Sequence, residues 1–335
     1  MKSFMARKYV RYVTEEKYKK VSEENKQIIK KYFNFKNMNL SESTKKSYNN
    51  DFKQWIYFIY EQYEKGILKE ENIIKLLNEE DGIEEMVDLI EDFVAFCTAF
   101  LGNNERRIQR RLSSISSFFL YLRKKRKIKE NPLDFLERPS VRAGEKQQII
   151  QNFLTEDEIN DIRKELKKLN NLQLEVYFEI SISTMARVNA ISNIKLNQID
   201  FEKKIISKVL EKEGYLVDLF PSELALSLTK ELIKKRKKEK IESEYLFITR
   251  YGNKWKKVSK TTIQTSWIKK IGNTINKNLH SHDLRHSASS ILFNKGMPLE
   301  NVQKLLNHQS PDTTLKYYVR QDVQKLQEQK KNFEI

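Results

Sequence analysis

A break in apolar periodicity near the middle of the chain most constrains its fold. Residues 137–151, ERPSVRAGEKQQIIQ, carry Pro, Gly and charge and have no repeating apolar spacing. Regularly spaced apolar residues occur on both sides of this break. The chain has 335 residues, which is long enough for two domains that each bury a core. We therefore expect two domains joined by a linker.

The part before the break has the pattern of a helical domain. An apolar face that includes Tyr48, Phe52 and Trp55 recurs at helical spacing, and Ser43 or Thr44 is expected to cap this helix. Two more long helices are expected within residues 83–101 and 104–127. Residues 1–40 are polar and basic, and we expect one loosely attached helix there. This region is assigned to an N-terminal extension, followed by a helical domain over residues 41–136.

Four arginines crowd the first two turns of the third of these helices. Cations at a helix N-terminus oppose the helix dipole, so helix stability alone does not explain their position. A solvated basic face is one interpretation and contact with DNA is the other. The excess of 63 Lys and Arg over 46 Asp and Glu, a net charge of +17, favours a polyanionic partner. The candidate DNA-binding residues are Arg106, Arg107, Arg110 and Arg111.

The part after the break mixes helices with a short β segment. Thr155 and Glu158 have the spacing of a helix capping box. Apolar helices follow on both sides of a break near residues 183–185, and residues 203–220 have the pattern of a β-hairpin that turns at Gly214. The predicted fold class is mainly α with a small β-sheet or hairpin, arranged as a helical domain and an α+β domain.

Composition excludes several other classes of protein. No run of about eighteen apolar residues is present, so we expect no membrane span and a cytoplasmic location. Cys97 is the only cysteine, which leaves no disulfide framework and no thiolate metal site. It lies in an apolar pattern, and we expect it to be a core thiol.

All four histidines lie in a single stretch, residues 280–308. His282 and His286 have the spacing of a metal-binding pair on a helix, but no acidic residue of the HExxH type accompanies them. The stretch also lacks the clustered carboxylates of a two-metal nuclease. It does combine arginine, histidine and tyrosine, which can bind phosphate, transfer protons and attack phosphorus. These residues indicate phosphoryl transfer without a metal, and Ser281 is expected to cap the helix that carries them.

The order and spacing of these residues resemble the tyrosine recombinase family, also called phage integrases. The resemblance covers about residues 155–320, and residues 41–136 are similar in pattern to the family's SAM-like core-binding domain. TMARVNAI, EKEG, HDLRHS and LLNHQSPDTTLKYY resemble the family's motifs in the family's order. The resemblance implies a catalytic domain over residues 152–320, a linker over 137–151 and a C-terminal helix or tail over 321–335. The implied catalytic residues are Arg187, Lys212, His282, Arg285, His308 and Tyr317.

The resemblance implies a mechanism in which Tyr317 attacks a DNA phosphodiester and gives a 3′-phosphotyrosyl link. Arg187 and Arg285 would neutralise the charge of the phosphate, and His308 would help to hold it. His282 would orient the phosphate or deprotonate the tyrosine. No metal or nucleotide cofactor is implied. The implied partner is double-stranded DNA, bound by a homotetramer on two DNA sites, with a monomer or dimer in the absence of DNA.

One departure from the family pattern and two rival residues bear on these assignments. Ala190 stands where an acidic residue often follows the first arginine, so support for that arginine must come from elsewhere. Lys212 is implied to protonate the leaving 5′ oxygen, but Lys208 lies on the same predicted hairpin. Tyr318 is adjacent to Tyr317, although the spacing from the last histidine favours Tyr317.

Two other functions remain open from the sequence. A DNA-binding regulator without catalysis would use the histidine stretch as a helix-turn-helix core. A type IB topoisomerase would share the chemistry but would only relax supercoils. The sequence also leaves the target site open, as well as whether the reaction serves a phage, a transposon or the chromosome.

Overall fold

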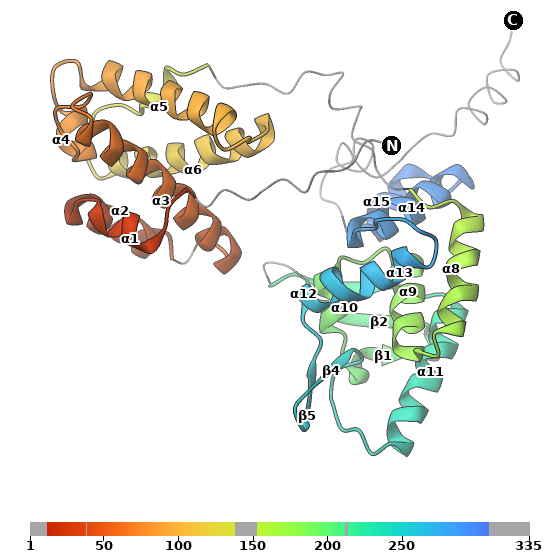
Figure 1. The fold of residues 1–335 in the computed structure, drawn as a ribbon. Coiled ribbons are helices and arrows are strands. Elements are labelled where there is room, and N and C mark those ends of the chain that lie inside the picture. Colours follow the sequence, from red (N-terminus) through yellow and green to blue (C-terminus); the bar gives the residue numbers. More distant parts are fainter. Residues whose placement is uncertain (1–11, 38, 138–152, 212–213, 308–335) are drawn as a thin grey trace, which may run out of the picture. The chain divides into compact units, whose positions relative to one another are not determined.

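The computed structural model describes residues 12–37, 39–137, 153–211 and 214–307, and the chain divides into two compact units, Met1–Ile149 and Ile150–Ile335. The described part of the first unit is helical, whereas the second unit combines helices with small sheets (Figure 1). The predicted fold class, mainly α with a small β-sheet, is confirmed.

The first unit packs its helices around an aromatic core. Trp55, Phe52 and Phe93 are each about 1% exposed, and Phe52 and Trp55 recur on α3 at the helical spacing read from the sequence. Cys97 belongs to this core as predicted, and burial raises the pKa of its thiol to about 11. The elements are α1 (Glu15–Lys20), α2 (Glu23–Lys36), α3 (Glu42–Glu64), α4 (Ile73–Leu77), α5 (Gly82–Ala99), α6 (Glu105–Lys124) and the 3₁₀ turn η1 (Pro132–Asp134).

Two expectations for this unit were wrong. The region before residue 41 forms two helices, and Tyr32 on α2 is fully buried in the same core as α3, so these helices are not loosely attached. The Tyr32 hydroxyl also forms a hydrogen bond of 2.9 Å with Ser117. Ser41, rather than Ser43 or Thr44, caps α3, because its hydroxyl accepts from a backbone N–H of the first turn at 3.2 Å.

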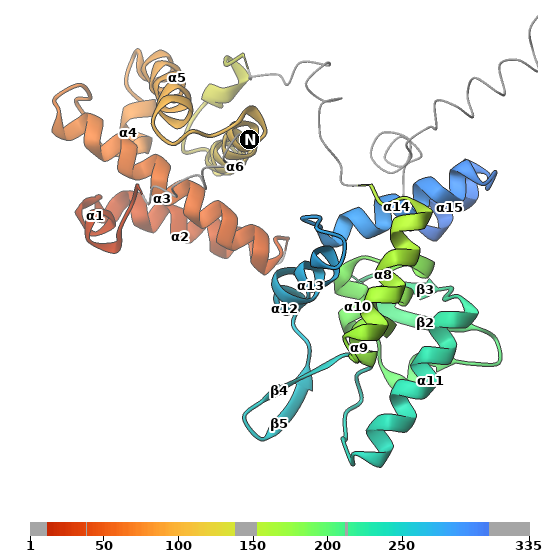
Figure 2. The same ribbon diagram turned by 45° about the vertical axis from the view of Figure 1, so that its right-hand side comes forward.

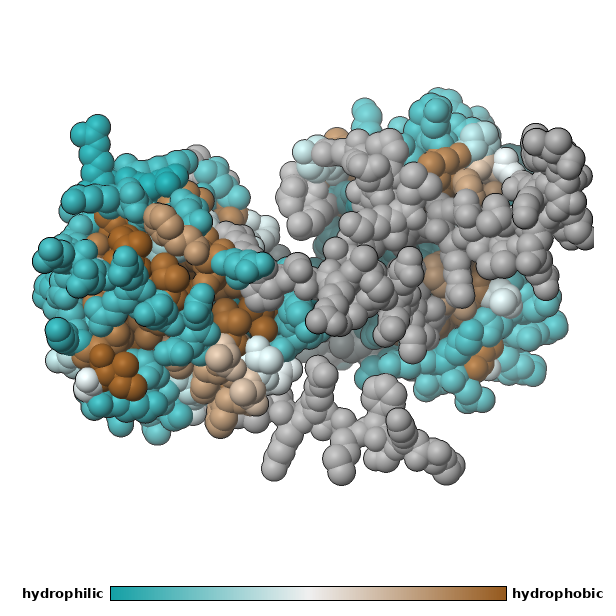
Figure 3. All heavy atoms as spheres, turned by 90° about the horizontal axis from the view of Figure 1, so that it is seen from above, coloured by the Kyte–Doolittle hydropathy of each residue, from teal (hydrophilic) through white to brown (hydrophobic). Residues whose placement is uncertain are grey.

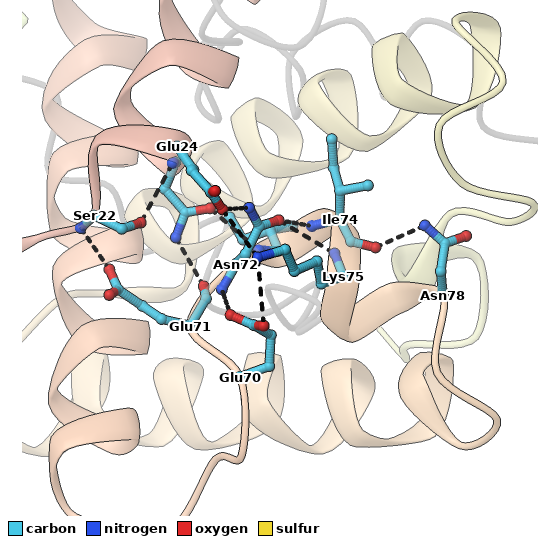
Figure 4. A network of polar contacts seen from close by, with 10 residues as sticks. Ser22, Glu24, Glu70, Glu71, Asn72, Ile74, Lys75 and Asn78 are labelled. Atoms are coloured by element: carbon cyan, nitrogen blue, oxygen red, sulfur yellow. Dashed lines mark hydrogen bonds and ion pairs between the residues drawn. The ribbon is translucent and has the colours of Figure 1, made fainter.

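A polar network joins α2 to α4 (Figure 4). The backbone N–H of Ser22 donates to the carboxylate of Glu71 at 2.7 Å, and the Asn25 side chain donates to the Glu71 carbonyl at 2.8 Å. Asn72 accepts from two N–H groups at the start of α4 and donates to the carboxylate of Glu24. Because paired polar groups are costly to separate once buried, the network fixes how α2 packs.

The second unit places a three-stranded antiparallel sheet, in the order β1-β2-β3, beside α10 (Figure 2). Thr155 and Glu158 form the predicted capping box at the start of α8. The elements are α8 (Glu156–Lys168), α9 (Leu172–Thr184), α10 (Val188–Asn193), η2 (Leu196–Gln198), β1 (Ile199–Asp200), β2 (Ile205–Leu210), β3 (Leu216–Leu219), α11 (Glu223–Lys238), β4 (Ile248–Tyr251), β5 (Lys254–Lys257), α12 (Lys260–Thr262), the π-helical turn η4 (Ile263–Trp267), α13 (Ile268–Asn273), α14 (Ser281–Asn294) and α15 (Leu299–Leu305).

The hairpin of β2 and β3 confirms the change of period read from the sequence. Val209 pairs with Val217, and Gly214 takes a φ of +83° in the turn, a value that favours glycine. Lys208 sits at an irregularity of the pairing with a φ of +53°, which marks a bulge in β2. The hairpin therefore bends before it reaches its tip.

Hydrophilic residues cover most of the described surface seen in Figure 3, with hydrophobic residues between them. Some of the exposed apolar side chains lie on the β4–β5 hairpin, where Tyr251 is 76% exposed. Among the residues that the structure describes, every helix is too short or too polar to serve as a membrane span.

Candidate active site

The first arginine motif lies at a sharp turn between α9 and α10. Met185 ends α9 in the left-handed conformation, with a φ of 52°, and its side chain is fully buried. Arg187 follows as the N-cap residue of α10, with extended backbone dihedrals. The break predicted near residues 183–185, with a second helix starting near Arg187, is confirmed. The turn leaves the Arg187 side chain 30% exposed.

Arg285 on α14 binds two distant backbone segments. Its side chain is buried, and the residue is only 2% exposed. One terminal nitrogen donates to the carbonyl of Met185 at 2.7 Å, and the other donates to the carbonyl of Leu306 at 2.6 Å. Charged hydrogen bonds of this length are among the stronger ones in proteins. One guanidinium thus joins the turn before Arg187 to the end of α15.

His282 lies on the first turn of α14, near both arginines. The residue is exposed as a whole, yet the protein atoms packed around its imidazole desolvate the ring. This desolvation, followed by the positive charges of Arg285 and Arg187, lowers the pKa of His282 below its ordinary value. The structure therefore brings three of the predicted catalytic residues into one electrostatic environment.

The cap of α14 differs from the one expected. The helix begins at Ser281, so Ser281 is not the capping residue, and His280 takes the N-cap position. The carboxylate of Asp283 accepts from the backbone N–H of His280 at 2.7 Å. The Ser287 hydroxyl, further along the helix, accepts from the backbone N–H of Leu154 at 2.7 Å. These contacts fix the helix that carries His282 and Arg285.

Glu211 pairs with Arg187, and the sequence did not single it out. Its carboxylate lies 2.6 Å from a terminal nitrogen of Arg187, and the Glu211 side chain is 8% exposed. Ala190, where an acidic residue was missing, is fully buried on α10. Glu211, which directly follows β2, thus supplies the acidic partner of Arg187 that α10 lacks at position 190. The only signals available were the acid beside Lys212 and the alanine at position 190.

Of the two candidate lysines, the structure describes Lys208. Side chains alternate between the faces of a strand, and Val209 and Glu211 are buried while Lys208 is exposed. Lys208 also lies at the bulge, where its backbone N–H donates to Asp218 at 2.8 Å. Lys212, like His308 and Tyr317, falls outside the described residues.

The four arginines at the start of α6 separate into two pairs. Arg106 and Arg110 are exposed. Arg107 donates to the fully buried carboxylate of Asp51 at 2.6 Å. Arg111 is 4% exposed and donates to Gln54 at 2.7 Å. Arg111 thus belongs to the core of the first unit, and the exposed basic face is narrower than the sequence indicated.

The described residues contain no group of three or more His, Cys, Asp or Glu side chains that could hold a metal ion. The rings of His282 and His286 lie 6.2 Å apart between centroids, as two residues one helical turn apart. His286 packs at the same centroid distance from Phe153. The donors that the described site offers are therefore suited to an anion.

The chain is similar in sequence to several known proteins. A sequence model of the phage integrase family matches residues 152–325 of the chain, which is more than half of it. The chain belongs to the phage integrase family. A tyrosine recombinase of Thermosipho africanus is 28% identical over 87% of the chain and 93% of its own length. Tyrosine recombinase XerC of Oceanobacillus iheyensis is 26% identical over 64% of the chain and 70% of its own length. The family prediction is confirmed.

Solved structures of other proteins have a fold similar to that of this chain. The XerH site-specific recombinase in a post-cleavage complex with its palindromic difH substrate matches with a TM-score of 0.65 and 17% identity, over 94% of the chain and 92% of XerH. A lambda integrase tetramer bound to a Holliday junction matches with a TM-score of 0.59 and 16% identity, over 88% of the chain and 77% of that protein.

Proposed function

We propose that the chain is a site-specific DNA recombinase that cleaves and rejoins DNA through a phosphotyrosyl intermediate. The observation that carries the proposal is the position of Arg285. This residue joins the segment before Arg187 to the segment before His308, and its positive charge helps to lower the pKa of His282. Two guanidinium groups whose charges act on the same imidazole are suited to a phosphodiester in transition. The matches to recombinases that act on DNA support the same reaction class.

In the proposed reaction, the phenolic oxygen of Tyr317 forms a bond to phosphorus as the bond to the 5′ oxygen breaks. Arg187 and Arg285 neutralise charge on the nonbridging oxygens, and His308 helps to hold them. The 3′-phosphotyrosyl link keeps the bond energy, and attack by a 5′-hydroxyl then rejoins the strand. The proposed reaction needs no metal or nucleotide, so it should proceed in the presence of a chelator.

Proton transfer is assigned to two further residues. His282 orients the phosphate or accepts the phenolic proton, which a neutral imidazole can do near neutral pH. Lys212 protonates the leaving 5′ oxygen. Lys212 is preferred to Lys208 because the motif EKEG, which resembles the family's lysine-bearing turn, contains Lys212, whereas Lys208 lies within β2 at the bulge.

DNA is the proposed partner of both units. In the first unit Arg106 and Arg110 are the proposed phosphate contacts, whereas Arg107 and Arg111 serve mainly to hold α6 against Asp51 and Gln54. We propose a core-binding domain over residues 41–136, a linker over 137–151, a catalytic domain over 152–320 and a tail over 321–335. The active assembly would be a homotetramer on two duplexes, and crosslinking on cognate DNA tests that stoichiometry.

The test of the proposed function is a covalent adduct. The protein is incubated with a nicked candidate site, and the products are separated by denaturing electrophoresis. We expect a protein–DNA band with the wild type and with Tyr318→Phe, but none with Tyr317→Phe. Tight binding to a verified cognate site without any adduct would favour the DNA-binding regulator instead. Relaxation of supercoils without strand exchange would favour the topoisomerase.

A further inference from the structure

The carboxylate of Glu211 is buried, although Glu211 lies where β2 ends and the turn to β3 begins. Its oxygen lies 2.6 Å from a terminal nitrogen of Arg187, and only 8% of the side chain is exposed. Several other carboxylates that pair with basic side chains in the second unit lie in solvent, such as Glu223 at 82% and Glu244 at 59% exposed. A buried carboxylate costs free energy unless a partner compensates for its lost hydration. The buried Arg187–Glu211 ion pair is therefore a specific structural contact of the site.

The geometry leaves most of the Arg187 guanidinium available. A guanidinium has five N–H donors, and the hydrogen bond to Glu211 uses one terminal nitrogen. The Arg187 side chain is 30% exposed, so the remaining donors have access to a ligand. A carboxylate on one side of the group restricts its rotation and leaves the other side to an anion. Such an arrangement orients a cation without blocking it.

Glu211 also closes the turn that follows β2. Its backbone N–H donates to the carbonyl of Tyr215 at 2.7 Å, across the turn whose sequence contains Lys212. The strand before it is bound to α10, because Asn193 donates to the carbonyl of Leu210 at 2.8 Å. The side chain of Glu211 therefore points at Arg187, while its backbone holds the base of the turn.

We propose that Glu211 is a positioning residue that orients the guanidinium of Arg187. The inference rests on the proposed role of Arg187 in binding the reacting phosphate. Glu211 supplies from the hairpin the carboxylate that position 190, an alanine, does not supply from α10. When Arg187 binds phosphate, the Glu211 contact persists, and both partners of Arg187 hold it in one geometry.

A competing role for Glu211 predicts the opposite result. If Glu211 occupied Arg187 in place of the phosphate, its removal would free the guanidinium and increase the rate of cleavage. If Glu211 orients Arg187, its removal lets the guanidinium leave the reactive geometry and decreases the rate. The sign of the change thus separates positioning from inhibition.

The experiment measures adduct formation by Glu211→Gln in the full-length chain. The variant keeps the shape of the side chain and removes its charge. At saturating protein on a nicked site, we expect the rate of adduct formation to fall by about 100-fold, the size of effect that a small misplacement of a reacting group produces. DNA affinity should change by less than about 2-fold, because one ion pair at a scissile phosphate is a small part of the total backbone contact.

Glu179→Gln is the matched control. Glu179 on α9 is also buried, at 4% exposure of its side chain, and it pairs with Arg163 on α8 at 2.7 Å. The control removes an equivalent buried charge, so it should lower the thermal midpoint as much as Glu211→Gln while adduct formation stays within about 2-fold of the wild type. A double variant supplies the second readout. In an Arg187→Ala background, Glu211→Gln should cause no further loss, because its effect acts through Arg187.

Each outcome bears on one proposal only. Equal rates for wild type and Glu211→Gln, faster cleavage by Glu211→Gln, or a full additional loss in the Arg187→Ala background would each overturn the positioning role. Failure of the wild type to form any Tyr317-dependent adduct would instead overturn the proposed function.

Discussion

Replacing Arg285 by Lys keeps the positive charge but removes one of the two hydrogen bonds that the guanidinium donates. The lost bond leaves the carbonyl of either Met185 or Leu306 without its charged donor in a buried position. A hydrogen bond to a charged group contributes about 1.5–3 kcal/mol net. We therefore expect the free energy of unfolding of the second unit to fall by about 2–3 kcal/mol, which lowers the thermal midpoint of a unit this size by about 5–10 °C.

Calorimetry of the full chain measures this shift, and Arg236→Lys is the matched control. Arg236 is also buried, at 7% exposure, and it donates to the carbonyl of Tyr245 and to the side chain of Gln173. Both variants should lose similar stability, but only Arg285→Lys should also lose adduct formation. If Arg285→Lys unfolds at the wild-type temperature, the two hydrogen bonds do not hold these segments, and the argument from Arg285 fails.

Two further predictions concern the charges. Changing both Arg106 and Arg110 to Ala should reduce the slope of log affinity against log salt by about 2 without lowering the thermal midpoint, whereas Arg111→Ala should lower the midpoint. A gel-shift salt series measures the slope, and a melting curve measures the midpoint. An unchanged slope would show that Arg106 and Arg110 do not contact DNA. Because the pKa of His282 is lowered on folding, the folded chain binds this proton less tightly than the unfolded chain, and its stability decreases as the pH falls through the ordinary histidine pKa of about 6.5. For the same reason the second-order rate of adduct formation should stay level through pH 6.5 and fall only at lower pH, and a rate already halved at pH 6.5 would contradict a lowered pKa.

Features that depend on neighbouring residues could be predicted from the sequence. The capping box of Thr155 and Glu158 needs only a three-residue spacing, and both of its hydrogen bonds are present. The hairpin likewise follows from a period of two on either side of Gly214, whose φ is positive as the turn requires. In each case the interaction lies within a few residues, so the pattern in the sequence already contains its geometry.

Contacts between distant segments could not be predicted in the same way. Arg187 and Glu211 are separated by 24 positions, and Arg107 and Asp51 by 56. Periodicity gives the face on which a side chain lies but not the segment that meets it. The burial of Arg111 was nevertheless within reach, because it follows Ile108 by three positions and therefore lies on the apolar stripe of α6. A basic residue on an apolar stripe indicates a buried ion pair or hydrogen bond before it indicates a surface contact.

The two acceptors of Arg285 stand at the same offset from two proposed catalytic residues. Met185 precedes Arg187 by two residues, and Leu306 precedes His308 by two residues. A change at Arg285 therefore alters the backbone that leads to both, in addition to any contact of its own with phosphate. The loss of adduct formation in Arg285→Lys then contains a part due to unfolding and a part due to the missing hydrogen bond, and only the second part should persist when low temperature restores the fold. A rate measured well below the thermal midpoint of the variant separates the two parts, because the hydrogen bond that Lys cannot make is missing at every temperature while unfolding is not.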